Sequence, residues 1–200
     1  MLCKRLSTVI ACFLFMILVS ATVGITAEKN FRDSLYQSGR LKPTDSELKV
    51  KVGDRAPAFS LPSMNGGAVS LAQFTGKKNV VISFVPAAWT PVCSDQWPGY
   101  VITRDLFDQF NATLIGITVD NIPTLYAWTR QMGNVWFEVL SDFWPHGDVA
   151  DQYGLLRSDG TSERALIFID MDGFIRGIHV SDINVRPPLE LIMEGLKNMN

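Results

Sequence analysis

A reactive cysteine is the strongest chemical signal in this sequence of 200 residues. Cys93 stands in Pro86-Ala-Ala-Trp-Thr90-Pro-Val-Cys93, soon after an apolar run that is typical of a buried strand. We expect Cys93 in the first turn of the helix that follows, where unpaired backbone N–H groups favour an anion. A thiolate is the nucleophilic form of cysteine, and Thr90 can offer its hydroxyl to the sulfur or to a substrate oxygen. The spacing therefore indicates an activated nucleophile.

The alternative is an inert buried cysteine, which is common in protein cores. Thr90, Pro91, Ser94 and Asp95 surround Cys93 with polar or helix-breaking side chains. These neighbours predict an accessible loop around the sulfur and weigh against the inert interpretation.

The fate of the N-terminal segment determines whether the chain keeps other cysteines that could pair with Cys93. Residues 1–27 begin with basic residues, continue through an apolar stretch and end in small residues, as a secretory signal peptide does. An uncleaved membrane anchor over residues 6–26 is the competing interpretation, since a stretch of about 20 apolar residues can span a bilayer. Both interpretations export the rest of the chain to an extracytoplasmic location, periplasmic or secreted. Cleavage would remove Cys3 and Cys12, and an odd thiol in an exported protein points to reactivity or intermolecular pairing.

Charge and composition exclude several functions for the rest of the chain. Without residues 1–27 the chain keeps 16 of its 18 basic residues against 20 acidic ones, a net charge of −4, so we expect no nucleic-acid partner. Residues 28–48 are polar and predict a tether, and residues 49–200 can form one domain with its own core. His146 and His179 are far apart with no cysteine beside them, so we expect no metal site, and thiolate chemistry at Cys93 needs no organic cofactor.

Alternating strand and helix patterns predict an α/β domain around the cysteine. The element order is typical of a thioredoxin-like fold, with a central mixed sheet flanked by helices and an N-terminal β-hairpin extension. The expected strands are 79–85, 113–119, 135–140, 165–169 and 174–180; the expected helices are 97–110, 122–132, 148–155 and 188–199; the hairpin is expected from 49–52 and 58–61 before the Asn65-Gly66-Gly67 turn.

With these residues in place, the sequence resembles the peroxiredoxin family over roughly residues 50–198. Four segments carry the resemblance in the order that the family shows. They are the domain opening Val52-Gly-Asp-Arg-Ala-Pro-Ala-Phe59-Ser-Leu61-Pro, the peroxidatic motif Pro86-x-x-x-Thr90-x-x-Cys93, the segment Val149-Ala-Asp-Gln-Tyr-Gly154, and Arg164 before Ala165-Leu-Ile-Phe-Ile-Asp170.

The resemblance implies a thiol peroxidase that acts on hydrogen peroxide or organic hydroperoxides. Cys93 would attack the peroxide and become a sulfenic acid, Pro86 would shield the sulfur, and Thr90 and Arg164 would position the peroxide. Without a resolving cysteine after Cys93, an external thiol or another donor would reduce the sulfenic acid. The chain departs from the family pattern at Gln96, where many relatives carry a glutamate that orders the arginine.

Gln96 puts the placement of Arg164 in doubt, and Asp95 or Glu163 could replace the glutamate as its partner.

We expect the five tryptophans to be mostly core, with Trp89 and Trp97 as candidates for a hydrophobic rim at the active site. Such aromatic residues can also form the contact of a homodimer.

Two rival functions use the same fold. A thiol–disulfide oxidoreductase would normally have a Cys-x-x-Cys pair and a proline before the strand at Ala165, and the sequence has neither. A non-enzymatic thioredoxin-like binding module would tolerate an inert Cys93, and it stays open at this point.

Overall fold

The computed structural model describes residues 31–199. The chain divides into two compact units, residues 1–36 and 37–200, and the second unit carries the sheet and the helices discussed below. The predicted signal peptide or anchor, and with it the membrane anchoring by residues 6–26, lies outside the described residues. Among the described residues, no helix is both long and apolar enough to cross a membrane.

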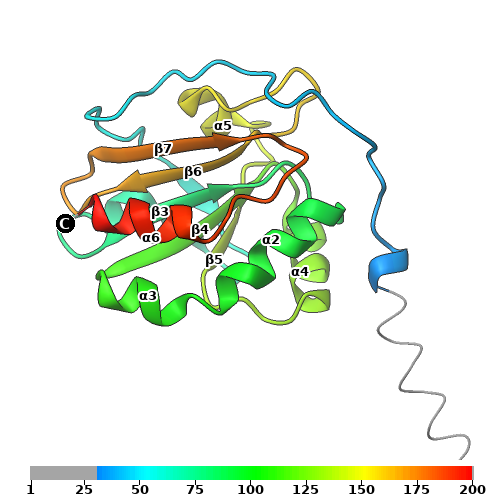
Figure 1. Ribbon diagram of the computed structural model, residues 1–200, viewed down its shortest axis with the longest axis horizontal. Helices are drawn as coiled ribbons and strands as arrows, with labels where there is room; N and C mark the ends of the chain where they lie inside the picture. The colour runs from blue at the N-terminus through cyan, green and yellow to red at the C-terminus, as the bar shows by residue number, and fades with distance from the viewer. Residues whose placement is uncertain (1–30, 200) are drawn as a thin grey trace, which may run out of the picture. The chain divides into compact units, whose positions relative to one another are not determined.

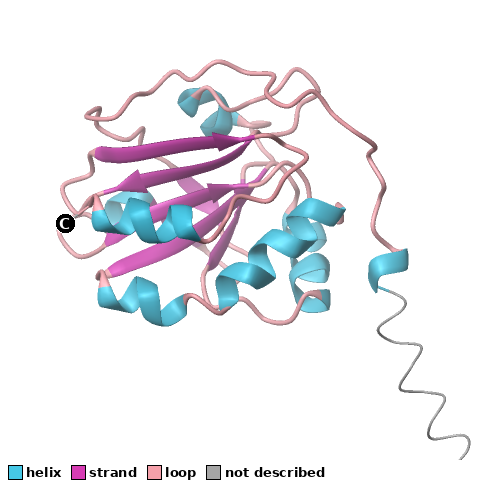
Figure 2. Cartoon of the chain, viewed as in Figure 1, coloured by secondary structure: helices cyan, strands magenta, loops and turns pink. Residues whose placement is uncertain are grey.

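A five-stranded mixed sheet forms the centre of the second unit (Figure 2), which confirms the predicted α/β, thioredoxin-like architecture. The strand order is β5-β4-β3-β6-β7. Strands β4 and β3 are parallel, β5 is parallel to β4, and β6 and β7 are antiparallel to their neighbours. The strands are β3 (Asn79–Phe84), β4 (Ala112–Thr118), β5 (Glu138–Ser141), β6 (Arg164–Ile169) and β7 (Ile175–Ser181).

The register brings two distant parts of the sequence together. Because β6 runs antiparallel to β3, Phe84 near the end of β3 pairs with Ala165 near the start of β6. Arg164 therefore lies at the carboxyl end of β3, the edge from which the chain continues toward Cys93. In α/β sheets this edge is where functional groups gather.

Helices pack on the sheet through close contacts at glycine. A Cβ atom at Gly116 in β4 would lie 2.6 Å from the ring of Trp97 in α2, and one at Gly195 in α6 would lie 2.1 Å from the ring of Phe168 in β6. Figure 1 shows α6 in front of the sheet and α2 and α3 below it in the view. The helices are α2 (Pro91–Val101), α3 (Arg104–Gln109), α4 (Ile122–Gln131), α5 (Asp148–Tyr153) and α6 (Glu190–Lys197).

The structure corrects the predicted helix after the cysteine and the predicted hairpin. Helical spacing over residues 97–110 predicts a helix that Pro98-Gly99 confines to its later part or kinks in its first turn, but α2 begins at Pro91, includes Pro98 and is separate from α3. Proline suits the first helical position because its missing N–H has no intrahelical acceptor there. The hairpin joins β1 (Ser60–Pro62) to β2 (Ala68–Ser70), and residues 49–52 form no strand.

Part of the polar segment before the domain is hydrogen-bonded to it. We call residues 41–49 the strap. Its Lys49 N–H donates to Tyr153 O at 3.2 Å, and its Ser46 hydroxyl donates to Gly154 O at 3.0 Å. Gly154 has a φ of 72°, and a Cβ there would lie 2.2 Å from Glu47 O, so only glycine admits the strap at this point. The folded unit thus extends beyond the predicted start at residue 49.

Candidate active site

Cys93 is the third residue of α2 and its side chain is fully buried. The sequence correctly places it in the first turn of a helix, but the expected accessible loop is wrong. Thr90 is the N-cap, and its carbonyl accepts from Ser94 N–H at 2.9 Å as the first bond of the helix. The backbone N–H groups of this first turn have no acceptor within the helix, so they favour negative charge at the position of the sulfur.

Arg164 is the group that distinguishes Cys93 from an inert core cysteine. Its Nη2 donates to Cys93 Sγ at 3.4 Å, although the two residues are 71 positions apart in sequence. Only 1% of Arg164 is exposed. A guanidinium cannot lose its proton near neutral pH, so a permanent positive charge lies beside the buried sulfur. In a site from which water is largely excluded, this charge acts on a thiolate more strongly than it would in water.

Gln96 fixes the other side of the guanidinium. Its Oε1 accepts from Nη1 of Arg164 in a very short hydrogen bond, while its Nε2 donates to Tyr100 Oη at 2.9 Å and to Ser83 Oγ at 3.3 Å. The amide therefore uses both of its ends in a buried network. Sequence reasoning flagged Gln96 only as a departure and missed Ser83 and Tyr100, whose positions in β3 and α2 carry no motif.

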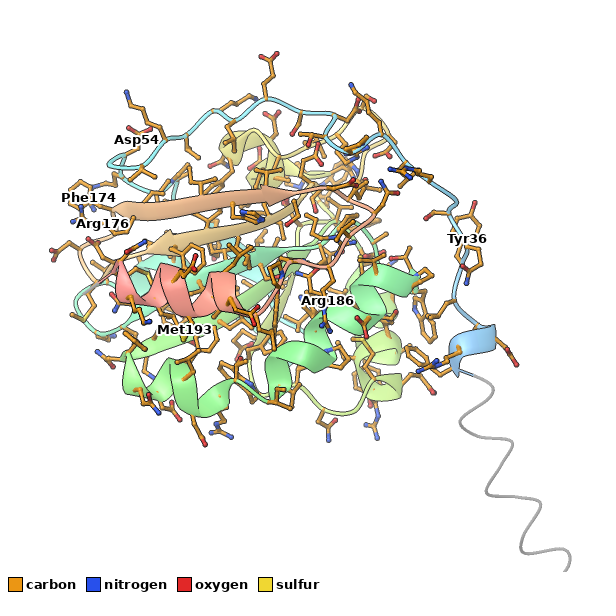
Figure 3. The ribbon with its side chains drawn as sticks, in the orientation of Figure 1. Tyr36, Asp54, Phe174, Arg176, Arg186 and Met193 are labelled. Atoms are coloured by element: carbon orange, nitrogen blue, oxygen red, sulfur yellow. The ribbon has the colours of Figure 1, made fainter. Side chains whose placement is uncertain are left out.

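The two acidic residues suggested as substitutes at this position have other partners. Asp95 is exposed and pairs at 3.1 Å with Arg186, which lies beside α2 in Figure 3. Glu163 is buried and pairs with Arg157 at 2.7 Å. Within residues 31–199, neither carboxylate hydrogen-bonds to Arg164, so that expectation is wrong, and Gln96 itself supplies the acceptor.

Tyr100 gives this network a measurable pH dependence. Burial raises the pKa of Tyr100 from 10.0 to about 12, and burial also raises the pKa of Tyr153. Since the unfolded chain then loses these protons at lower pH than the folded one, stability is fully present below about pH 10 and is lost as the pH rises toward 12. We expect a fall of up to about 3 kcal/mol from Tyr100 alone across this range.

Urea unfolding at about pH 8 and at about pH 11 measures the first half of this loss, about 1.4 kcal/mol. The variant Tyr100→Phe, which keeps the ring and removes the ionising group, is the matched control and should lose less stability over the same interval. Equal losses in the two proteins would show that Tyr100 does not titrate as its burial requires.

Thr90 and Pro86 belong to the loop between β3 and α2. Pro86 is buried, and the backbone of Trp89 has a φ of 60°, which is unusual for a residue other than glycine. The carboxylate of Asp120, after β4, holds this loop by accepting from Ala88 N–H at 2.8 Å. The Thr90 hydroxyl donates to Ala87 O at 2.9 Å. Its hydrogen is therefore used, and its lone pairs can only accept a hydrogen bond from a substrate.

The geometry gives a prediction for Thr90. Thr90→Val keeps the shape of the side chain and removes the acceptor for a substrate O–H, so the rate of Cys93 oxidation by hydrogen peroxide should fall at least about tenfold. Thr90→Ser keeps the hydroxyl and should stay within a few fold of the unmodified protein. Stopped-flow oxidation of the two variants makes the comparison, and equal rates would exclude an acceptor function.

Aromatic side chains pack beneath the helix rather than around its mouth. Trp97 is fully buried and lies 4.9 Å from Trp128, ring centroid to ring centroid. Trp128 donates from Nε1 to Ser94 Oγ at 2.9 Å, which ties α4 to the first turns of α2. The expected rim is therefore wrong for Trp97, whereas Trp89 is half-buried. Trp144 is the tryptophan with the largest exposure in the described part of the chain, at 80%.

The arrangement suits nucleophilic chemistry at sulfur. It combines a cysteine at a helix N-terminus, a charged donor directed at the sulfur and a hydroxyl acceptor on the adjoining loop. Donors placed near a reacting atom stabilise charge that develops in the transition state. Within residues 31–199, no three histidine, cysteine, aspartate or glutamate side chains are grouped to hold a metal ion.

Comparison with known proteins finds relatives that are similar in sequence and in fold. The AhpC/TSA family profile matches residues 52–178. Alkyl hydroperoxide reductase E of Mycobacterium tuberculosis is 34% identical over 128 residues, which cover 64% of this chain and 83% of that protein. The chloroplastic 2-cysteine peroxiredoxin of Chattonella marina is 25% identical over 68% of this chain and 74% of its own. The reduced 2-Cys peroxiredoxin of Plasmodium vivax superposes with a TM-score of 0.70 at 29% identity, covering 74% of this chain and 81% of the other.

The chain belongs to the AhpC/TSA family, the peroxiredoxins, as the resemblance of its motifs predicts. It is a thiol-dependent peroxidase, an oxidoreductase with peroxide as the acceptor. Nothing in these relationships favours the non-enzymatic binding module.

Proposed function

We propose that Cys93 is the peroxidatic cysteine and that Arg164, Thr90 and Pro86 form its peroxide site. The observation that carries this assignment is the hydrogen bond from Arg164 Nη2 to Cys93 Sγ at 3.4 Å, in the first turn of α2. In this proposal, hydrogen peroxide or an alkyl hydroperoxide binds beside the sulfur and donates its O–H to Thr90 Oγ1, whose own hydrogen is used by Ala87 O. Pro86, buried in the loop before the helix, limits the access of water to the sulfur.

Reduction of the peroxide by Cys93 needs neither a metal nor an organic cofactor. The Cys93 thiolate attacks the terminal oxygen of R–O–O–H, a sulfur–oxygen bond forms and the oxygen–oxygen bond breaks. The electron pair of the broken bond leaves on the other oxygen as RO⁻, which takes a proton to give an alcohol, or water when the substrate is hydrogen peroxide. The N–H groups of Arg164 stabilise the charge on the separating oxygens. Cys93 is left as a sulfenic acid.

We propose that an external thiol completes the cycle. Cys93 is the free cysteine of the described residues, and the sequence has no cysteine after it. A donor thiol condenses with the sulfenic acid to give a mixed disulfide and water, and a second thiol releases Cys93 and forms the donor disulfide. The mixed disulfide is the intermediate that separates this cycle from one closed within the chain.

The donor step is tested by adding one equivalent of hydrogen peroxide and then a small thiol such as cysteine or glutathione. Intact mass is expected to show one donor molecule attached per chain before full reduction. Full recovery of the thiol without any adduct, even at limiting donor concentration, would argue against the mixed disulfide.

We also propose that residues 1–27 export the protein, so that the enzyme works outside the cytoplasm. The basic, apolar and small-residue order of that segment supports the proposal. Cell fractionation in the native host, followed by mass measurement of the recovered protein, tests it. Export predicts an extracytoplasmic fraction; a chain found with the cytoplasmic enzymes would contradict the proposal.

A further inference from the structure

The carbonyl of Ile183 holds the catalytic guanidinium from the side opposite Gln96. It accepts from Arg164 Nε at 3.2 Å and from Arg164 Nη2 at 3.0 Å. Nη2 is the same nitrogen that donates to Cys93 Sγ. Because the donors of a guanidinium have a fixed planar geometry, the position of the Ile183 carbonyl sets the direction of the N–H that faces the sulfur.

The Ile183 peptide is in turn held by the strap. Ile183 N–H donates to Pro43 O at 3.1 Å. The next residue, Asn184, pairs with the backbone of Leu41 in both directions: its Oδ1 accepts from Leu41 N–H at 2.9 Å, and its Nδ2 donates to Leu41 O at 2.9 Å. Asp182 Oδ1 accepts from Asn184 N–H at 2.8 Å and from Nδ2 at 2.7 Å, which keeps the amide in place.

The strap also binds the residue that precedes Arg164. Glu163 Oε1 accepts from Asp45 N–H at 2.5 Å, and its Oε2 pairs with Arg157 at 2.7 Å. Arg157 Nη2 donates to Lys42 O at 3.0 Å. The side chains of Arg157 and Glu163 are 3% and 0% exposed, so this ion pair is buried and its partners have little freedom to move. Residues 41–45 of the strap are therefore bonded to the Glu163–Arg157 pair, which directly precedes Arg164, and to the Ile183–Asn184 segment, which contacts its guanidinium.

We propose that residues 41–45 and Asn184 position Arg164 for peroxide reduction, with Asn184 as the positioning residue that couples the strap to the Ile183 carbonyl. The proposal rests on the peroxidase function and extends it to a segment that contributes no atom to the site. Errors in placement of about 1 Å at a reacting centre can cost on the order of 10²-fold in rate. Contacts that define the direction of one N–H group can therefore affect the rate as strongly as a direct contact with the substrate.

A double-mutant cycle distinguishes positioning from simple support of the fold. We expect Asn184→Ala to lower the second-order rate constant for Cys93 oxidation by hydrogen peroxide about tenfold. When Arg164 is already alanine, the same change should cost less than about twofold, since residues that act through one another are not additive. Ser46→Ala, which removes a strap hydrogen bond to Gly154 and leaves the bonds to Ile183 and Asn184 in place, is the matched control and should keep the rate within about twofold.

Two outcomes would overturn the proposal. One is an unchanged rate in Asn184→Ala, and the other is the same fold loss in both backgrounds, which is the result of a purely structural effect. If Asn184→Ala does not fold, Asn184→Asp serves in the same cycle, because it keeps the acceptor for Leu41 and loses the donor. A failure of the peroxidase function itself looks different, since the unmodified protein would then react as slowly as an ordinary free thiol.

Discussion

Replacement of Cys93 by serine should reduce peroxide consumption to the rate of the thiol-containing buffer without protein. A serine hydroxyl is not ionised near neutral pH and is a poor nucleophile without an adjacent base. Among the described residues, Arg164 is the side chain that hydrogen-bonds at that atom, and a guanidinium donates hydrogen bonds and accepts none. The measurement is the loss of hydrogen peroxide and of an organic hydroperoxide in the presence of excess thiol.

Folding of the variant is the control for this experiment. Serine can accept the Arg164 hydrogen bond in place of sulfur, so Cys93→Ser should unfold within a few degrees of the unmodified protein. A folded variant that still consumes peroxide at the original rate would remove Cys93 from the mechanism.

Replacement of Arg164 by alanine should slow Cys93 oxidation by about 10²- to 10³-fold, the effect of removing one transition-state donor in comparable sites. The same change leaves Gln96 Oε1 and the Ile183 carbonyl without their donor. Each buried acceptor left in this way costs about 1–3 kcal/mol, so the variant should also be less stable. Stopped-flow oxidation and urea unfolding measure the two effects separately.

Arg164→Lys is the matched variant. Lysine keeps the charge but cannot reach Gln96, Ile183 and Cys93 together, because it lacks the planar fork of donors. We expect its rate to lie between those of the alanine variant and the unmodified protein. A lysine variant at full rate would show that charge alone is needed and that the bonds to Gln96 and Ile183 have no catalytic importance.

The sequence predicts the elements that place the nucleophile. Residues 79–85 and 165–169 are largely apolar runs, which are typical of buried central strands, and the structure confirms both strands. The structure ends α5 at Gly154 and begins α4 after Asn121, whose side chain accepts from Thr124 N–H at 3.0 Å; both residue types are favoured at these helix ends.

The partners of Arg164 could not be predicted in the same way. Ile183 acts through its backbone carbonyl, which every residue possesses and no motif marks. Ser83 lies within an apolar strand, and Tyr100 follows a proline and a glycine in the sequence. The burial of Cys93 depends on packing between segments far apart in the chain, so its polar neighbours in sequence gave the wrong expectation.

The most direct test of the central claim is a single turnover of the reduced protein with one equivalent of hydrogen peroxide, quenched by a sulfenate trap and analysed by intact mass and peptide mapping. The account predicts rapid addition of one trap molecule per chain, located on Cys93, and none in Cys93→Ser. Oxidation at the slow rate of an ordinary free thiol, or label on a residue other than Cys93, would contradict it.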